Sequence, residues 1–446
     1  MSHLLQFSVC FLLITYGVMQ GPFSSQAATK PEAHSAQKDS LPETTPLLHE
    51  SIEAELFENP AQALSVWRQF RASQPTLVLL SQNPLLLPVP EALHKEAIEL
   101  IQTGPAEALA EKTSISNSDP LLLPSMALSS ALQSGLFAKV VWVFPTAAPN
   151  DQLNVDMFRK QLLGLGAISP KEAQSLVKHD GEITGSIRGL PFHAVTLNAL
   201  PDLDGPVVLH IDIGYFKPLY KGEIKTPLYP LLYNTLKALR NKAWVTVTET
   251  TSYSTTDSEL PLAVRFLGPT LMTLLKSPEL LNQPMPLNWE RRAKALYIQN
   301  FMQTEGEREL YLEMEVDQPE DPSVKYALYQ VSRKSKRGMA ALDYLARAVE
   351  IDPGYAFEYL DLARIAEEKG LSEQTLKMML LINKALPDDP FITLQVATQL
   401  NDLGHTDQAL QLIKKLQQLP WSEVYYPNMP ERLETLVYTF MRNDSE

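Results

Sequence analysis

The last quarter of the chain repeats itself every 34 residues. When residues 336–353, 370–387 and 404–421 are aligned, apolar or small residues share columns: Ala341, Thr375 and Ala409; Leu342, Leu376 and Leu410; Leu345, Met379 and Ile413. The preceding stretches repeat as well, with large apolar residues beside mostly small ones: Leu328, Leu362 and Val396; Tyr329, Ala363 and Ala397. A fixed period of this length is typical of stacked helical hairpins.

The predicted turns support the same interpretation. Gly370 and Gly404 stand where the chain must leave the first helix of a hairpin with positive φ, and Pro353 and Pro387 follow the second helix in register. These features resemble a tetratricopeptide array, in which each unit is a pair of antiparallel helices. The resemblance implies an all-α solenoid that holds a protein or peptide in its groove. One irregular helical bundle is the alternative.

The first and last parts of this array differ from the rest. Lys336 replaces the turn glycine, with Gly338 two residues later, and Tyr329 occupies the position of the small residue, so we expect the first unit to be distorted or to form a cap. Residues 421–446 carry apolar residues at helical spacing and predict a closing helix. A further alternative is an array that only supports the rest of the chain, with its groove filled by the preceding domain or by residues 422–446.

Length and composition predict two folded domains. The chain has 446 residues, of which 45% are hydrophobic and 20% charged, enough to form sizeable cores. Its formal charge of −14 argues against nucleic acid as a partner, because phosphate binding requires a concentrated positive surface. The sequence contains no serine-hydrolase elbow, phosphate-binding glycine loop, dinucleotide fingerprint or His-Glu-x-x-His pattern.

The N-terminal 27 residues resemble an export signal. An uncharged apolar stretch covers residues 4–19, and Ser25-Gln26-Ala27 predicts cleavage before Ala28, which makes the protein periplasmic or secreted and free of the membrane after cleavage. An uncleaved N-terminal anchor is the alternative. The single cysteine, Cys10, lies inside this segment, so the mature chain would have no thiol. The composition of residues 28–50 predicts a disordered linker.

Residues 51–285 predict an α/β domain, and residues 286–446 predict the helical domain. Short β-rich runs alternate with amphipathic stretches, a pattern typical of helices around a mostly parallel sheet. The predicted strands are 76–80, 139–144, 183–188, 206–213 and 243–249. The predicted helices are 61–72, 91–102, 126–135, 155–165, 170–179, 227–241 and 259–276. A helix is expected from near Asn288, and one further strand over residues 310–316.

Two polar residues interrupt the apolar run of residues 207–213. His210 and Asp212 are two positions apart in a predicted strand, so they point to the same face and can share a metal near the carboxyl end of the sheet. A hydrogen-bonded pair is the alternative. Glu249, at the end of the last predicted strand, either faces the same crevice and takes a substrate cation or is a solvated strand-end carboxylate.

The order of three segments carries a second resemblance. Residues 76–85, 135–145 and 209–216, followed by the strand that ends near Thr250, resemble the arginase and deacetylase superfamily, in a branch related to peptide arginases. The likeness covers roughly 200 residues in order and implies a three-layer, mostly parallel sheet. It also implies a two-manganese hydrolase, whose ligands come from an Asp-x-His-x-Asp motif and from a later Asp-x-Asp motif.

The positions that would hold these two ions are largely replaced in this chain. The first motif falls on Ser81, Asn83 and Leu85, and the second on His210, Asp212 and Gly214. One carboxylate and one imidazole leave most of the charge of two divalent cations uncompensated. We therefore expect an exported scaffold with a pseudoenzyme domain and no cofactor. The alternative is a manganese-dependent hydrolase of a guanidine or amide C–N bond, with His210 as ligand or base and Asp212 as ligand or orienter.

Overall fold

The computed structural model describes residues 52–146, 154–220, 228–253 and 262–443. The predicted export segment, 1–27, and the predicted linker, 28–50, lie outside the described residues. Within those ranges, no helix combines the length and the apolar character needed to cross a bilayer.

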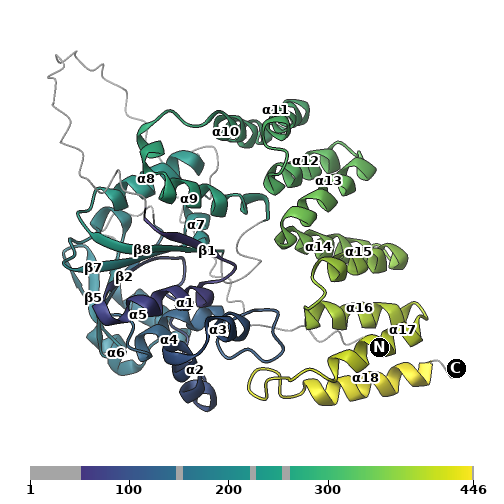
Figure 1. The fold of residues 1–446 in the computed structure, drawn as a ribbon, viewed down its shortest axis with the longest axis horizontal. Coiled ribbons are helices and arrows are strands. Elements are labelled where there is room, and N and C mark those ends of the chain that lie inside the picture. The colour runs from purple at the N-terminus through teal and green to yellow at the C-terminus, as the bar shows by residue number, and fades with distance from the viewer. Residues whose placement is uncertain (1–51, 147–153, 221–227, 254–261, 444–446) are drawn as a thin grey trace, which may run out of the picture. The chain divides into compact units, whose positions relative to one another are not determined.

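Eight strands of the described residues form one sheet (Figure 1). They are β1 Ala54–Phe57, β2 Thr76–Leu80, β3 Lys139–Val143, β4 Val177–His179, β5 Glu182–Ile187, β6 Leu190–Val195, β7 Pro206–Asp212 and β8 Val245–Ser252. The strand order is β1-β8-β7-β2-β3-β6-β5-β4. The first six strands in this order pair in parallel, and β5 and β4 add an antiparallel edge. The predicted mostly parallel sheet is confirmed.

Each face of this sheet has its own apolar core, because successive side chains of a strand point to opposite faces. Leu77 and Leu79 pack on one side with α1 (Leu64–Trp67), α2 (Glu91–Thr103), α3 (Ala106–Lys112) and α4 (Ala127–Gln133). Val78 and Leu80 pack on the other with α8 (Leu228–Arg240) and α9 (Leu267–Lys276). The short helices α5 (Val155–Gly164), α6 (Pro170–Ser175) and α7 (Phe216–Tyr220) complete this part. The arrangement is three layers.

Several predicted elements of this part differ in their bounds. The predicted helix 61–72 is divided into the 3₁₀ helix Pro60–Ala63, α1 and the 3₁₀ helix Arg68–Ser73, and within the predicted helix 259–276 the α-helix α9 covers Leu267–Lys276. The predicted helix 170–179 ends at Ser175, and residues 177–179 form strand β4. The turn after β4 explains the difference, because Asp180 and Gly181 both have positive φ and form the kind of two-residue hairpin turn that Asp-Gly favours. The last predicted strand, 243–249, starts later and continues to Ser252, and this extension places Glu249 in the middle of β8.

The C-terminal part is helical from Leu287 to Asn443, as predicted. Its helices are α10 Leu287–Gln299, α11 Thr304–Asp317, α12 Pro322–Lys334, α13 Gly338–Ile351, α14 Phe357–Glu368, α15 Ser372–Ala385, α16 Pro390–Asp402, α17 Thr406–Leu416 and α18 Met429–Asn443. The expected closing helix corresponds to α18. The strand expected over residues 310–316 is wrong, because these residues lie inside α11. Tyr311 and Met314, three residues apart, provide its buried face, whereas Val316 is 81% exposed.

The turns of four consecutive helix pairs repeat at the spacing read from the sequence. Met302, Lys336, Gly370 and Gly404 each have positive φ, between 56° and 78°, and each lies 34 residues after the one before. They separate α10 from α11, α12 from α13, α14 from α15 and α16 from α17. The pair α10–α11 is therefore a further hairpin in register, which the sequence comparison missed because Met302 replaces the turn glycine.

The first predicted unit accommodates its unusual residues through a buried acidic side chain. Glu358 of α14 is 7% exposed and accepts hydrogen bonds from the hydroxyls of Tyr326, at 2.5 Å, and Tyr329, at 2.6 Å. Arg333 adds an ion pair at 3.0 Å. Tyr329 thus fills the position of a small residue without leaving its hydroxyl unpaired, which would be costly in a buried site.

The turns before α14 and α16, and the segment after α17, also contact the α/β part. Arg265, before α9, binds Asp352 at 2.7 Å, and Ser116 donates a hydrogen bond to Asp389 at 2.8 Å. The backbone N–H of Ser422 donates to the carbonyl of Ser118 at 3.0 Å. All these residues belong to one compact unit that begins at Thr45. The two parts are therefore joined by side chains as well as by the chain itself.

Candidate functional site

His210 is the most enclosed of the residues predicted to form a site. Strand β7 places its ring against β8, where Nδ1 lies 2.9 Å from Oγ1 of Thr250 and Nε2 lies 3.1 Å from Oγ of Ser252. The ring of Trp67 packs edge-on against it, with ring centroids 5.2 Å apart. The side chain is fully buried, and burial lowers the pKa of His210 to about 3. His210 is therefore a neutral imidazole with both nitrogens in contact with hydroxyls.

The hydrogen bonds around Thr250 indicate which nitrogen of His210 carries the proton. Oγ1 of Thr250 accepts from Nε1 of Trp67 at 3.0 Å and lies 3.3 Å from the carbonyl oxygen of Leu209, to which it can donate. Because its single proton is used there, Oγ1 can only accept from Nδ1 of His210. Nε2 then accepts the proton of Ser252. Binding a metal or taking up a proton at Nε2 requires this last hydrogen bond to break.

Asp212 lies on the same face of β7 as His210 but is bound in the turn that follows. Its carboxylate accepts the backbone N–H of Gly214 at 2.7 Å and caps the short 3₁₀ helix Ile213–Tyr215. Asp212 is only 3% exposed. Gly214, the third position of the second motif, contributes its backbone rather than a ligand atom.

The positions of the first metal motif lie in a tight turn after β2. The hydroxyl of Ser81 donates to the carbonyl of Asn83, and the carbonyl of Ser81 accepts from Nε1 of Trp142 at 3.0 Å. Leu85 has a φ of 56°, is 2% exposed, and uses its carbonyl to accept the backbone N–H of Leu128. This segment is thus held by backbone hydrogen bonds and apolar packing.

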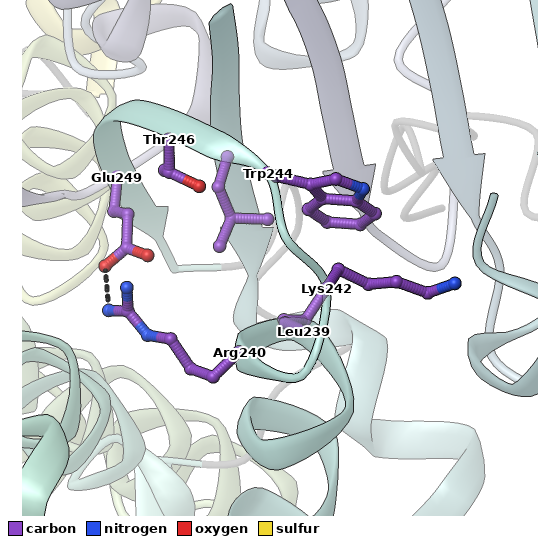
Figure 2. A pocket seen from close by; sticks show the side chains of 7 residues that line it. Leu239, Arg240, Lys242, Trp244, Thr246 and Glu249 are labelled. Atoms are coloured by element: carbon purple, nitrogen blue, oxygen red, sulfur yellow. Dashed lines mark hydrogen bonds and ion pairs between the residues drawn. The ribbon is translucent and has the colours of Figure 1, made fainter. Parts of the chain in front are cut away.

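Glu249 lies on the opposite face of the sheet from His210, so the expectation that both line one crevice is wrong. It pairs in register with Leu209 and binds Nη2 of Arg240 at 2.9 Å (Figure 2). Both side chains are almost fully buried, at 1% and 5% exposure, so the alternative of a solvated carboxylate is wrong as well. Burial raises the pKa of Glu249 to about 7, although Arg240 opposes the shift.

The pocket around this pair is narrow and mixed in character. Leu239, Lys242, Trp244 and Thr246 line it together with the ion pair (Figure 2). Arg240 also lies 3.3 Å from the carbonyl oxygen of Leu275 in α9. Because the pair connects β8 to the helices on one face, we assign it a role in packing.

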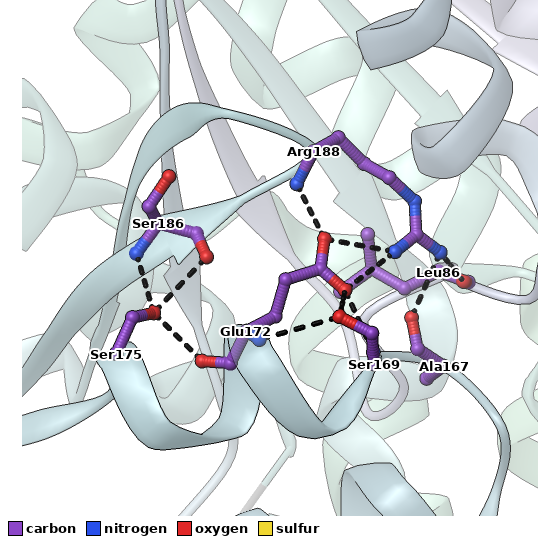
Figure 3. A network of polar contacts seen from close by, with 7 residues as sticks. All are labelled: Leu86, Ala167, Ser169, Glu172, Ser175, Ser186 and Arg188. Carbon is purple, nitrogen blue, oxygen red and sulfur yellow. Dashed lines mark hydrogen bonds and ion pairs between the residues drawn. The ribbon is translucent and has the colours of Figure 1, made fainter.

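A second charged pair, which the sequence did not suggest, fixes the antiparallel edge. Glu172 and Arg188 bind each other at 2.9 Å, and Arg188 also donates to the carbonyls of Leu86 and Ala167 (Figure 3). Burial tends to raise the pKa of Glu172, but hydrogen bonds from the amides of Ser169 and Arg188 outweigh it, and the pKa is lowered. The capping box formed by Ser169 and Glu172 is a local signal for the helix start, but it carries no information about the partner of Glu172 at the end of β5.

These residues do not converge on one point. Across the described ranges, no three side chains of His, Cys, Asp or Glu are grouped so that they could hold a metal ion. His210 and Asp212 share a face and are engaged in different hydrogen bonds, whereas Glu249 lies behind the sheet. The two strand residues proposed to line a crevice are thus engaged in hydrogen bonds within the fold.

The helical part, by contrast, has an open groove. It lies along α15 and beside the turn between α16 and α17, and leucines form its floor: Leu376, Leu380, Leu381 and Leu403. The remaining lining residues are charged or polar: Glu373, Lys377, Lys384 and His405. Leu380 is 45% exposed, which is unusual for a leucine in a packed helix.

Comparisons with protein-family models, with curated proteins and with solved structures find no match for this chain. The function must therefore be argued from the residues and their geometry.

Proposed function

We propose that this protein is an exported scaffold whose tetratricopeptide-like array binds another protein or a peptide, with an arginase-like pseudoenzyme domain beside it. The observation that carries the proposal is the placement of His210, Asp212 and Glu249. The first two are engaged in separate buried hydrogen bonds, and the third is paired with Arg240 behind the sheet. Their engagement in the fold supports the pseudoenzyme half of the proposal.

The array supports the binding half of the proposal. Four helix pairs with turns 34 residues apart form a stack in which each pair packs on its neighbour, and such stacks present long surfaces to partners. The leucine-lined groove lies along α15, the second helix of its pair. Exposed apolar side chains rimmed by charges are a common feature of protein-binding sites.

Manganese loading tests the pseudoenzyme half. The chain from Ala28 onward, incubated with manganese and then desalted, is expected to retain fewer than about two ions, the number that a dinuclear site requires. It is also expected to release no product from arginine or an arginyl peptide. Retention of about two ions, with turnover that disappears in His210→Ala, would replace the scaffold proposal with the hydrolase.

Site-specific photocrosslinking in the native host tests the binding half. A photoreactive residue at Leu380, in the groove, or at Met339, which is 92% exposed at the start of α13, is expected to give discrete adducts. The same residue at Val177, on the exposed edge of the sheet, serves as the control. Adducts from Val177 alone, or from none of the three positions, would contradict the proposal.

A further inference from the structure

The groove beside α15 is built from one face of a single helix. α15 buries Thr375, Met378, Met379 and Ile382, a set spaced for its core-facing side. At about 100° per residue, Leu376 and Leu380 lie roughly 110° and 150° around the helix from the middle of this set, so they are on the side turned away from the core. Leu403, from the turn between α16 and α17, also lines the groove. The leucines of α15 and Leu403 together form the apolar part of the groove.

Two lysines flank this apolar part without a partner. Lys377 and Lys384 line the groove, are exposed, and form no ion pair with any residue in the described part of the chain. Their spacing of seven residues corresponds to two helical turns, or roughly 10 Å along α15. Glu373 supplies one opposing charge at the start of the groove.

The charge of this groove is opposite to that of its surroundings. Residues 306–446 carry 15 lysines and arginines against 24 aspartates and glutamates, yet the groove holds two lysines, one histidine and one glutamate. Many basic residues of α10–α14 are neutralised by ion pairs, as Arg333 is by Glu358 and Lys334 by Glu307. A ligand that fits this groove therefore has negative charges for the unpaired lysines and apolar side chains for the exposed leucines.

We infer that this groove binds an amphipathic, acidic helical segment of a partner protein, with its leucine-type side chains on Leu376 and Leu380. Carboxylates two turns apart on the bound helix reach Lys377 and Lys384. Helices that dock into grooves present anchors at such spacings, and paired opposite charges set their register. The inference rests on the proposed scaffold function and specifies the surface and the partner chemistry.

A designed peptide tests this inference directly. The probe is a fluorescein-labelled, 18-residue helical peptide with leucines along one face and two glutamates seven residues apart beside them. Its anisotropy is titrated with the chain from Ala28 onward at about 0.15 M salt, where screening of surface charges is realistic. We expect saturable binding that weakens at least tenfold in Lys377→Glu/Lys384→Glu and in Leu380→Asp.

Matched controls separate the groove from general charge. Lys414→Glu/Lys415→Glu changes two exposed lysines of α17 that do not line the groove, and it should leave binding within about twofold. A peptide with lysines in place of the two glutamates should bind Lys377→Glu/Lys384→Glu more tightly than the unmodified chain. Circular dichroism checks that each variant keeps its helical content.

Three outcomes would overturn the inference. They are no saturable binding, equal binding by the unmodified chain and Lys377→Glu/Lys384→Glu, and a dimer of this chain that Lys377→Glu/Lys384→Glu dissociates, which would place a second copy in the groove. None of them decides the scaffold proposal, because crosslinks from Met339 would still indicate a partner elsewhere on the array. Conversely, a bound manganese pair with turnover would end the pseudoenzyme proposal whatever the peptide does.

Discussion

At the scale of single residues, His210 shows how a side chain suited to chemistry can serve packing. Its ring bridges two hydroxyls of β8 and closes the space beneath Trp67. A charged imidazole is disfavoured in this fully buried site, because its hydrogen-bond partners are two hydroxyls rather than a carboxylate. The consequence is a measurable dependence of stability on pH.

We predict that acid destabilises the protein through His210. Its pKa is about 3 in the folded chain and 6.5 in the unfolded chain, so between these values the unfolded chain binds more protons. The free energy of unfolding therefore falls as the pH falls below about 6.5, with a limiting slope of about 1.4 kcal/mol per pH unit. Urea unfolding at pH 7 and pH 5 should show a loss about 2 kcal/mol smaller in His210→Asn than in the unmodified chain.

The control for this measurement is His405→Asn, which alters an exposed imidazole. This variant should lose as much stability between the two pH values as the unmodified chain. If His210→Asn also behaves like the unmodified chain, His210 is not buried in its neutral form and the interpretation of the crevice fails.

A second prediction concerns the buried pair of Arg240 and Glu249. Glu249→Ala leaves a guanidinium that is 5% exposed without its carboxylate, which typically costs about 3–5 kcal/mol. Replacing both members by apolar residues, as in Arg240→Met/Glu249→Leu, should cost far less than the two single changes together. Chemical denaturation of the unmodified chain, Arg240→Met, Glu249→Leu and the double variant measures the coupling energy. Additive losses would mean that the two side chains do not depend on each other.

At the scale of helices and strands, the turns of the array carry most of the regularity. Gly370 and Gly404 adopt positive φ at little cost, whereas Met302 and Lys336 hold the same conformation with a side chain. The period is thus a property of the backbone, and the sequence follows it only in part.

We predict that glycine at the two exceptional turns stabilises the array. Met302→Gly and Lys336→Gly should each raise the free energy of unfolding by about 1 kcal/mol, because the strained conformation becomes favourable. Gly370→Ala is the reverse change at an equivalent turn with open space around it, and it should lower stability by a similar amount. Thermal unfolding followed by circular dichroism measures all three. Losses in the first two would show that Met302 and Lys336 make contacts worth more than the strain.

The sequence predicted the elements whose pattern is local and buried. Strands β2 and β7 were placed to within one residue because each is a short run rich in buried Val, Leu and Ile, which in β7 only His210 and Asp212 interrupt. Strand β6 was missed because Pro191 interrupts it, and β4 because all three of its residues are exposed. The residues 310–316 alternate in polarity like a strand, but their partner was another helix.

The predicted site shows the same limit. The sequence identified His210, Asp212 and Glu249 as polar residues in apolar strands that required an explanation. Their actual partners depend on which strand lies beside which, and on a register between β7 and β8 that contains an irregularity at Val207 and Val208. No local pattern contains that information. The groove beside α15 could not be predicted from the sequence either, because it requires Leu403 and Leu380, which belong to different helix pairs, to line the same surface.

At the scale of the whole molecule, Arg265 connects the sheet to the helical array. Its guanidinium binds Glu58, which follows β1, at 2.7 Å and Asp352, which precedes α14, at 2.7 Å. It also lies over the ring of Tyr253, 3.9 Å from the centroid, at the end of β8. One side chain therefore joins three segments that are far apart in the sequence, and we expect the two parts to unfold together.

The space beside this arginine is available only because residue 354 is glycine. A Cβ at Gly354 would lie 2.3 Å from Cζ of Arg265, so alanine must displace the guanidinium. We predict that Gly354→Ala lowers the free energy of unfolding by about 1–3 kcal/mol, the usual cost of overpacking. Gly338→Ala is the matched control, since its Cβ would meet nothing within 4 Å at the start of α13, and alanine there should be neutral or stabilising.

A double substitution decides whether Gly354 acts through Arg265. If it does, Arg265→Ala removes the collision, and Gly354→Ala should then cost almost nothing further, so the two losses should not add. Trp421 lies in the helical part and Trp142 in strand β3 of the sheet. Variants that keep only one of these tryptophans follow the unfolding of each part separately by fluorescence. In Arg265→Ala their urea transitions should separate, whereas in the unmodified chain they should coincide. Additive losses in the double variant would mean that Gly354→Ala does not act through Arg265. Coincident transitions in Arg265→Ala would mean that the remaining contacts at Ser116 and Ser422 are sufficient to couple the array to the sheet.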